Sequence, residues 1–313
     1  MSRGQIPAVS ILMAVYNGQD YLREALDSLL AQTMQDFELV VVDDASTDQT
    51  KGILNQYAAQ DDRMRVLRNA ENLGVASSLN RGLSECRASL IARADADDIF
   101  EPERLSRQAA FMREHPEIGV SGSAVRFIDD TGNPKPEQPS PLYTRDQDIR
   151  FHLQLTTCFW HTTVIFRRDL VRQVNGYDTA FTEGPEDYDL WARLRSKTRF
   201  ANLPAVLARQ RLHRHSVTGS GWSEGLRLYG QVAQRVISDY LGRSISEREA
   251  FAAAMLYGWP VQLDTVSVNE GLALLREIWR QAQRREDPQT RRLFRRKLVS
   301  ALVAEARTRL YCA

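Results

Sequence analysis

Short, nearly continuous apolar runs constrain the fold of this chain more than any other feature. Residues 8–15 (AVSILMAV) and 37–42 (FELVVV) have strand length, and such runs are typical of strands buried on both faces of a parallel sheet. Between them, apolar residues recur at helical spacing from 21 to 30, which predicts a helix. Strands that alternate with helices predict a doubly wound, mostly parallel α/β sheet. Further strands are expected at 64–67 and 89–94, and further helices from about 46–48 to 60 and at 73–86.

The strand expected at 89–94 runs directly into three carboxylates, Asp95, Asp97 and Asp98. Side chains two positions apart in a strand point to the same side, so Asp95 and Asp97 could present their oxygens together. Hard oxygen ligands suit Mg²⁺ or Mn²⁺, and Mg²⁺ usually keeps sites for water and substrate phosphates. The alternative is a solvated acidic loop in which Asp98 begins the next helix. The cluster alone leaves both interpretations open.

Polar residues also follow the first and second strands. Ligands of doubly wound sheets bind beyond the carboxyl ends of the strands, so these residues should converge with the aspartates. Tyr16 could offer its ring to a base, and Asp43 or Asp44 could accept a hydrogen bond from a base or a ribose hydroxyl. Packing of Tyr16 and helix capping by Asp44 would explain the same residues without a ligand. Neither GxGxxG nor GxxxxGK[ST] follows a strand, which argues against an ordinary dinucleotide site or a P-loop.

The composition indicates a globular, cytoplasmic protein. The chain has 313 residues, of which 43% are apolar and 26% are charged. A formal net charge of +1 gives no general attraction to polyanions, so no nucleic-acid partner is expected. Cys86, Cys158 and Cys312 lack metal-ligand spacing and fit a reducing compartment without disulfides. Neither a signal peptide nor a run approaching the length of a membrane span is evident, so we expect the chain to be neither secreted nor membrane-spanning.

Taken together, five segments resemble the donor half of bacterial family 2 glycosyltransferases, inverting enzymes with the Rossmann-like GT-A fold. The segments are VSILMAVYN, SLLAQT, FELVVVDDASTD, ENLGVASSLNRGL and IARADADDI, and the resemblance extends over roughly residues 8–215. Their shared order and spacing are more specific than any single motif. The resemblance implies a nucleotide-sugar donor, commonly UDP-linked, for hexosyl or N-acetylhexosaminyl transfer. It also implies a divalent metal, Mn²⁺ or Mg²⁺, that bridges the donor phosphates to the aspartates.

The same resemblance implies roles for residues at matching positions. In family members the residue matching Tyr16 lies by the base, the one matching Asp44 contacts uracil, and the aspartate cluster shares ribose and metal contacts. It does not say whether Asp97 or Asp98 is the nearer metal ligand. We therefore expect the nucleotide sugar to be bound by Tyr16, Asn17, Asp44, Asn72, Arg93, Asp95 and Arg211, and the metal by Asp97, Asp98 and His213.

A second chemical stretch, NGYDTAFTEGPEDYDLWARL, covers residues 175–194. Carboxylates at its helix start are explained equally by N-terminal capping or by the base that inverting transfer requires. EDYDLW matches the family's ED motif, whose aspartate is the base, so the resemblance implies catalysis by Asp187 with Glu186 as its partner. Asp189 is then expected on the helix surface. His161, in FWHTTVIFR, is a candidate for acceptor contact, with a satisfied core histidine as the alternative.

A basic cluster follows a strand expected at 205–208 and consists of Arg209, Arg211, His213, Arg214 and His215. By resemblance this segment lies near the pyrophosphate, where cations would stabilise an anionic leaving group. The alternative is a solvated basic loop. We expect His213 to be the main ligand in this cluster, either to the metal or to a phosphate.

The pattern changes to helices after residue 222. We expect a glycosyltransferase domain at 1–222, with a nucleotide-sugar half at 1–100 and an acceptor half at 101–222, and a helical region at 223–313. Residues 271–313 carry eleven Arg or Lys against four Asp or Glu. In the helix expected at 288–310, arginines precede a face formed by Phe294, Leu298, Ala301 and Leu302, the pattern of a helix lying on an anionic membrane. Packing of that face on its own domain is the alternative, and the oligomeric state stays open.

The expected function is metal-dependent, inverting transfer of a sugar from a nucleotide-sugar donor to a glycan or lipid-linked acceptor in surface polysaccharide biosynthesis. A nucleotidyltransferase is the first alternative, but it would be expected to show a Gly-rich basic loop after the first strand, where Val15-Tyr16-Asn17-Gly18 stands. A non-catalytic sugar-nucleotide-binding protein is the second, and it would tolerate loss of the aspartates, which are all present.

Overall fold

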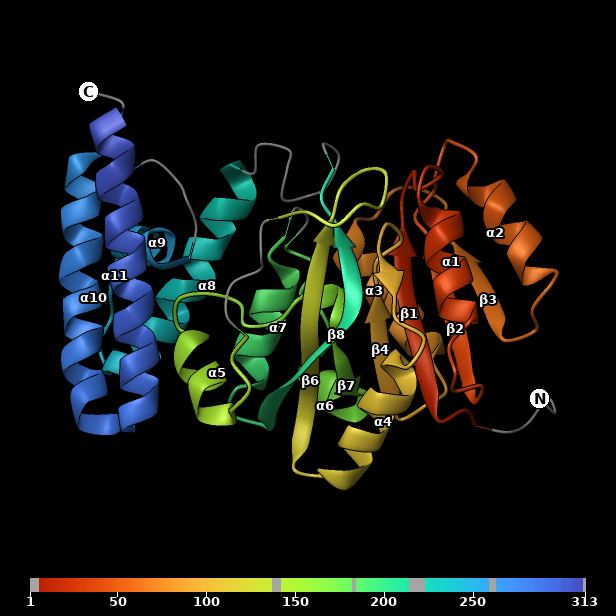
Figure 1. Cartoon of the computed structure of the whole chain (residues 1–313), viewed down its shortest axis with the longest axis horizontal. Helices are drawn as coiled ribbons and strands as arrows, with labels where there is room; N and C mark the ends of the chain where they lie inside the picture. The colour runs from red at the N-terminus through yellow and green to blue at the C-terminus, as the bar shows by residue number, and fades with distance from the viewer. Residues whose placement is uncertain (1–5, 137–141, 182–183, 214–222, 259–262, 312–313) are drawn as a thin grey trace. The chain divides into compact units, whose positions relative to one another are not determined.

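The structure, a computed structural model, divides into two compact units. It describes residues 6–136, 142–181, 184–213, 223–258 and 263–311, without the side chains of 223–224, 265 and 300–311. The first unit comprises residues 1–144 and 159–221, and the second comprises 145–158 and 222–313 (Figure 1). The change near residue 222 lies where the sequence pattern turns helical. Residues 145–158, which we expected in the acceptor half, instead cluster with the helices.

Four parallel strands form one half of the sheet in the first unit. They are β1 (Val9–Val15), β2 (Phe37–Asp43), β3 (Met64–Arg68) and β4 (Leu90–Ala94), in the order β3-β2-β1-β4. These are the strands that the apolar runs predict, in parallel register along their whole length. Their carboxyl ends consequently lie at one edge, which brings residues 16–17, 44 and 95–98 to the same side of the sheet.

The sheet continues beyond β4 with mixed strands in the order β7-β6-β8-β5. These are β5 (Ile99–Phe100), β6 (Ile118–Ile128), β7 (Ile165–Arg167) and β8 (Arg199–Arg211). β7 is antiparallel to β4 and β6, β8 is parallel to β6, and β5 is antiparallel to β8. The strand expected at 205–208 is thus part of a longer one. β5 was not expected, and it separates Asp98 from the following helix, so Asp98 does not cap that helix.

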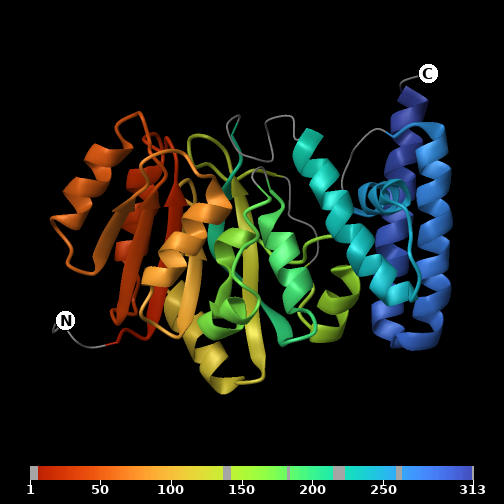
Figure 2. The same cartoon turned by 180° about the vertical axis from the view of Figure 1, so that it is seen from behind.

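Helices cover both faces of the sheet (Figures 1 and 2). Side chains of β1 alternate between them: Ile11 and Met13 belong to a core shared with α1 (Leu22–Leu30), α2 (Thr50–Ala58) and α4 (Arg104–Glu114). Leu12 faces α3 (Val75–Glu85) so closely that a Cβ on Gly82 would lie 2.4 Å from Leu12 Cδ1. Each buried Leu or Ile contributes roughly 1.5–3 kcal/mol, so this core fixes the strand ends firmly. The acceptor half adds the 3₁₀ turn η1 (His161–Thr163), α6 (Arg168–Gln173) and α7 (Glu186–Leu194).

The second unit consists of helices. They are α5 (Asp146–His152), α8 (Ser223–Leu241), α9 (Glu247–Gly258), α10 (Thr265–Arg285) and α11 (Pro288–Tyr311). A capping box begins α9, because Glu249 N–H donates to Ser246 Oγ at 3.2 Å and Ser246 N–H donates to Glu249 Oε2 at 2.9 Å. In the described part of the chain, no helix combines the length and the apolar character that a membrane crossing requires.

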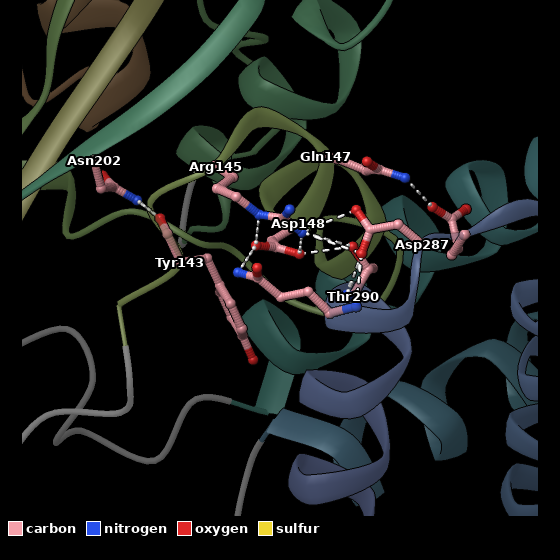
Figure 3. Close-up of polar contacts among 9 residues, drawn as sticks. Tyr143, Arg145, Gln147, Asp148, Asn202, Asp287 and Thr290 are labelled. Carbon is pink, nitrogen blue, oxygen red and sulfur yellow. Dashed lines mark hydrogen bonds and ion pairs between the residues drawn. The ribbon is translucent and has the colours of Figure 1, made fainter.

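Residues 145–158 are held to α11 by a polar network within this unit (Figure 3). Asp148 is 1% exposed and accepts hydrogen bonds from Arg145 Nε at 2.8 Å and from Thr290 Oγ1 at 2.6 Å. Asp287 accepts from Arg145 Nη2 at 3.0 Å and from the Thr290 N–H at 2.8 Å, which caps the start of α11. This network explains why residues 145–158 belong to the helical unit.

The structure corrects the expected membrane-facing surface of α11. Phe294 is fully buried, with its ring centroid 5.2 Å from Phe151, 5.3 Å from Tyr257 and 5.9 Å from Trp279. The face that contains Phe294 therefore packs within the helical unit, because three aromatic rings of that unit cover it. The side chains of Ala301 and Leu302 lie outside the described residues.

Candidate active site

The aspartates after β4 lie beside residues from the far end of β8. Arg93, near the end of β4, is 3% exposed and forms an ion pair with Asp95. Asp97 Oδ2 lies 2.9 Å from His213 Nε2. The structure therefore brings Asp97 and His213, two of the expected metal ligands, into direct contact although they are 116 residues apart.

Asp98 is the most perturbed carboxyl of the cluster. It is 2% exposed, its Oδ1 accepts the Arg211 N–H at 2.8 Å, and its buried Oδ2 has no hydrogen-bond partner among the residues that the structure describes. Burial, together with the charges of Asp97 and Asp95, raises the pKa of Asp98 well above its ordinary value. A neighbouring cation would stabilise the ionised form of this carboxyl.

The aspartate cluster fits a metal that is shared with a ligand. Among the described residues, no group of three or more His, Cys, Asp or Glu side chains is arranged to hold an ion. Mg²⁺ and Mn²⁺ sites that include a substrate phosphate need only one or two protein carboxylates, with water and phosphate completing the coordination. The unpartnered Oδ2 of Asp98 fits such a site.

Arg211 is a structural residue, which corrects our expectation of direct donor contact. Its side chain is 1% exposed; Nε donates to the Asp97 carbonyl at 3.0 Å, and Nη1 donates to the carbonyls of Asp129 and Asp130, both at 3.1 Å. Nη2 pairs with Glu24. Four of the five guanidinium N–H groups donate to these partners, so the side chain fixes the loop of the aspartates.

The rest of the basic cluster divides in two. Arg209 Nε pairs with Glu101 Oε1 at 2.8 Å, and its side chain is 42% exposed. Arg214 and His215 lie outside the described residues. Of the described residues in this basic cluster, His213 is the one whose side chain contacts an aspartate carboxylate.

Tyr16 and Asn17 have different positions at the end of β1. Tyr16 is 50% exposed, so its ring is not packed in the core and has a face available to a ligand. Asn17 has a positive φ of 51°; its N–H donates to Ser46 Oγ at 2.9 Å, and its Oδ1 accepts the Thr47 N–H at 2.8 Å. Asn17 therefore ties the loop after β1 to the loop after β2 through its backbone N–H and Oδ1, and so places Tyr16.

Asp44 shapes the loop before α3. Its Oδ1 accepts from Asn69 Nδ2 at 2.6 Å and from the Leu73 N–H at 2.9 Å, and its Oδ2 accepts from the Gly74 N–H at 2.9 Å. A carboxylate has about four acceptor positions, so one remains on Oδ2 for a ligand. Asn72 is exposed and its Oδ1 also accepts the Gly74 N–H, at 3.0 Å.

The carboxylate pair at the start of α7 lies beside His161. Glu186 Oε1 is 3.5 Å from His161 Nδ1, and His161 Nε2 is 3.0 Å from the hydroxyl of Tyr177. Asp187 is partly exposed and its Oδ1 accepts the Tyr188 N–H at 2.7 Å. Pro185, and not a capping side chain, precedes the helix, which leaves the carboxylates at its positive end.

Burial shifts the ionisation of this group. It raises the pKa of Asp187 to about 6. A charge on His161 would lower this pKa, and the charge of Glu186 raises it. Burial also raises the pKa of Glu186 and lowers that of His161 to about 4. At neutral pH His161 is therefore uncharged, and Asp187 is ionised yet more basic than an ordinary aspartate.

The two acidic groups belong to one site. The η1 turn lies against the end of β4, because the Arg93 N–H donates to the Val164 carbonyl at 2.8 Å and the Asp95 N–H donates to Thr162 Oγ1 at 3.3 Å. Arg93 and Asp95 both lie close enough to shift the pKa values of Glu186 and Tyr177. Two of the expected donor residues, Arg93 and Asp95, therefore adjoin the group of the expected base at the carboxyl end of β4.

Three residues of the site differ from the sequence-based expectations. Tyr177, buried with a raised pKa, orients His161, and only its place in the stretch 175–194 pointed to it. Arg104 was not among the expected site residues; it is fully buried, and its Nη2 donates to the Arg93 carbonyl at 2.5 Å. Asp189, expected on the surface of α7, is fully buried and pairs with Arg193 at 2.7 Å, because it lies one turn from this partner.

The parallel half-sheet, the antiparallel extension beyond it and the acidic site at the strand ends define a transferase of the GT-A type. Solved structures share this fold. TarS of S. aureus in complex with UDP-GlcNAc has a TM-score of 0.66 and 18% identity, over 96% of this chain and 91% of that one. The mannosyltransferase PcManGT from Pyrobaculum calidifontis, in complex with GDP-Man and Mn²⁺, has a TM-score of 0.59 and 18% identity, over 98% and 88%.

Sequence comparison defines the family. The model described as glycosyl transferase family 2 matches residues 10–174. EpsE of Bacillus subtilis is 36% identical over 60% of this chain and 66% of its own length, slightly under two thirds. The O-antigen biosynthesis glycosyltransferase WbnJ of Escherichia coli is 30% identical over 70% of this chain and 85% of its own length. The chain belongs to glycosyltransferase family 2, as the motifs indicated.

Proposed function

We propose that this chain transfers a sugar from a UDP-sugar to an acceptor hydroxyl with inversion at the anomeric carbon, and that Asp187 is the general base. The observation that carries the proposal is the position of Asp187. It is partly exposed at the start of α7, its pKa is raised to about 6, and it lies in the group that adjoins the end of β4. A base with this pKa is ionised at neutral pH and accepts a proton readily.

In the proposed step, the acceptor oxygen bonds to the anomeric carbon while its proton passes to the Asp187 carboxylate. The bond between the anomeric carbon and the diphosphate oxygen breaks, and its electron pair leaves with the nucleoside diphosphate. Glu186 and Tyr177 hold neutral His161 from both ring nitrogens, at 3.5 Å and 3.0 Å. Because both ring nitrogens already have partners, His161 would lie beside the acceptor as a neutral positioning residue, and it does not compete with the base for the proton.

For the donor, we propose that the exposed ring of Tyr16 stacks on the base and that the remaining acceptor position of Asp44 takes the uracil N–H. Asn17 and Asn72 set the two loops that place these residues. We propose that the Arg93–Asp95 pair contacts the ribose or the sugar of the donor. The nucleotide, UDP, is proposed from structures of the same fold: TarS was solved with UDP-GlcNAc, and PcManGT was solved with GDP-Man.

We propose that Asp97, Asp98 and His213 would hold Mn²⁺ or Mg²⁺. The contact between Asp97 and His213 supports this, and so does the structure of PcManGT, which contains Mn²⁺. When bound, the ion would neutralise charge on the diphosphate as it leaves. We propose that the acceptor is a glycan or lipid-linked sugar of a surface polysaccharide, as the name of WbnJ suggests. We also propose that the protein reaches this acceptor from the cytoplasmic face of the membrane, with the helical region as its peripheral contact.

The test is incubation with a panel of UDP-, GDP- and dTDP-sugars and Mn²⁺, with lipid-linked and free glycans as acceptors. We expect release of free UDP and a glycosylated product of inverted configuration. Release of pyrophosphate would identify a nucleotidyltransferase instead. Tight nucleotide-sugar binding without any turnover would identify a non-catalytic binding protein, and in either case the proposal would be wrong.

A further inference from the structure

Two neighbouring helices of the second unit present arginines on matching stripes. On α10, Arg276, Trp279, Arg280 and Gln283 follow the spacing i, i+3, i+4, i+7, which places them on one face. On α11, Pro288, Arg291, Arg292 and Arg295 have the same spacing, and Val299 lies one turn further on. The two helices run side by side in both views (Figures 1 and 2). We call the surface formed by these nine residues the arginine face.

The arginine face has an apolar centre. A hollow of about 270 Å³ is lined by Trp279, Gln283, Pro288, Arg291, Arg292 and Arg295. Trp279 is half-buried at this place, with its inner side on Phe294, and Val299 is 52% exposed at one end. An aromatic ring and aliphatic stems surrounded by guanidinium groups suit the boundary between lipid headgroups and acyl chains.

Most of the positive charge of this face is not neutralised by the carboxylates nearby: the hydrogen bonds from Arg243 mainly lower the pKa of Glu277, and the charge of Arg280 adds a smaller part. Glu277 pairs with Arg243 at 2.5 Å, Glu286 accepts from the Tyr240 hydroxyl at 3.1 Å, and Asp287 pairs with Arg145 at 3.0 Å. All three are thus directed to partners outside the two stripes. Arg276, Arg280, Arg292 and Arg295 are exposed and form no ion pair within the described part of the chain.

We propose that the arginine face binds the surface of a bilayer that contains anionic phospholipids. A second copy of the chain is a poor occupant, because a two-fold contact would place five arginines against five arginines. Nucleic acid would satisfy the charge but not the apolar hollow or Val299. The surface differs from the one that the sequence suggested, since it lies around Trp279 and not on the buried side of Phe294.

This inference deepens the peripheral placement in the proposed function, but its measurement does not depend on transfer. The full-length chain should sediment with vesicles of phosphatidylcholine and phosphatidylglycerol (3:1) in 20 mM salt, and not with pure phosphatidylcholine. Raising the salt to about 0.5 M should release it, because the Debye length falls well below 10 Å. Each arginine at an anionic surface strengthens partition roughly five-fold.

The variant R280Q/R292Q/R295Q removes three exposed arginines of this face, so its fold should be kept, which circular dichroism checks. Its partition should fall roughly one hundred-fold. The matched control is R107Q/R113Q/R172Q, which changes the net charge equally at exposed arginines of the first unit and should bind as the parent does.

Equal binding of the triple variant and the parent would overturn the proposal. So would absence of parental binding, equal loss in the control, or binding that tRNA abolishes at a concentration where the vesicles are in excess. Sedimentation equilibrium gives a further test. If the triple variant dimerises more strongly than the parent and the parent does not bind vesicles, the charge only prevents self-association, which also contradicts membrane binding. Donor turnover in solution should be unchanged in both variants, so failure of this inference is distinguishable from failure of the proposed function.

Discussion

Replacement of Arg211 by Met separates a structural role from a ligand role in the basic cluster. Met keeps most of the aliphatic volume but removes hydrogen bonds to the carbonyls of Asp97, Asp129 and Asp130. Loss of one partner of a buried ionic network typically costs about 3–5 kcal/mol. Glu24 is 53% exposed and stays solvated, so we expect the low end, about 3 kcal/mol.

Arg209, two residues earlier on the same strand, is the matched control. Its guanidinium pairs only with Glu101 and is 42% exposed, so Arg209→Met should cost less than about 1 kcal/mol. Equilibrium urea unfolding gives both free energies, provided that the m values stay equal. Equal small losses would refute the structural role. Parental stability with lost UDP binding would show that Arg211 contacts the donor directly, as the sequence had suggested.

Three further outcomes are expected. The value of kcat/KM should rise with pH through a midpoint near pH 6 and level off about one pH unit higher, because the base must lose its proton, and Glu186→Gln should move this transition to lower pH since the Glu186 charge raises the pKa of Asp187; a profile flat down to pH 5 would contradict this. UDP should bind about ten-fold or more tightly with Mn²⁺ than with excess chelator in calorimetry, because a cation relieves repulsion at Asp98; equal affinities would exclude a bridging ion. Asp148→Asn should destabilise the helical unit by about 2–3 kcal/mol at pH 7, whereas Asp146→Asn should cost less than about 1 kcal/mol, because the Asp146–Arg150 pair is long at 3.8 Å. Burial raises the pKa of Asp148, but hydrogen bonds from Arg145 and Thr290 lower it overall. The stabilisation by Asp148 is therefore present above the pKa of the unfolded state and should vanish as the pH falls through the pKa of the folded state.

The donor half could be predicted closely because its information is local. Continuous apolar runs are required for strands covered on both faces, and β1, β2, β3 and β4 lie within one or two residues of their predicted bounds. Residues at the ends of parallel strands must share an edge, which is why Tyr16, Asp44 and the aspartates could be grouped from sequence alone.

The antiparallel half could not be predicted because its partners are distant. β5 has two residues and no periodicity, and it exists because Ile99 pairs with Arg209 across the sheet. The burial of polar side chains also depends on partners that are distant in the sequence. Arg211, Asp189 and Arg104 are ordinary polar positions in the sequence, and only the partners that tertiary structure brings to them decide that they are buried. The place of residues 145–158 depends likewise on Thr290 and Phe294.

The central claim is that Asp187 accepts the proton of the acceptor, and the direct measurement is the transfer rate of Asp187→Asn with its affinity for UDP. Asn preserves size and the hydrogen bond from the Tyr188 N–H but cannot take up a proton at neutral pH. We expect kcat to fall about 10²–10⁴-fold with UDP affinity within about three-fold of the parent, whereas Asp169→Asn, at a carboxylate 73% exposed on α6, should change neither. Transfer by Asp187→Asn near the parental rate would contradict the account.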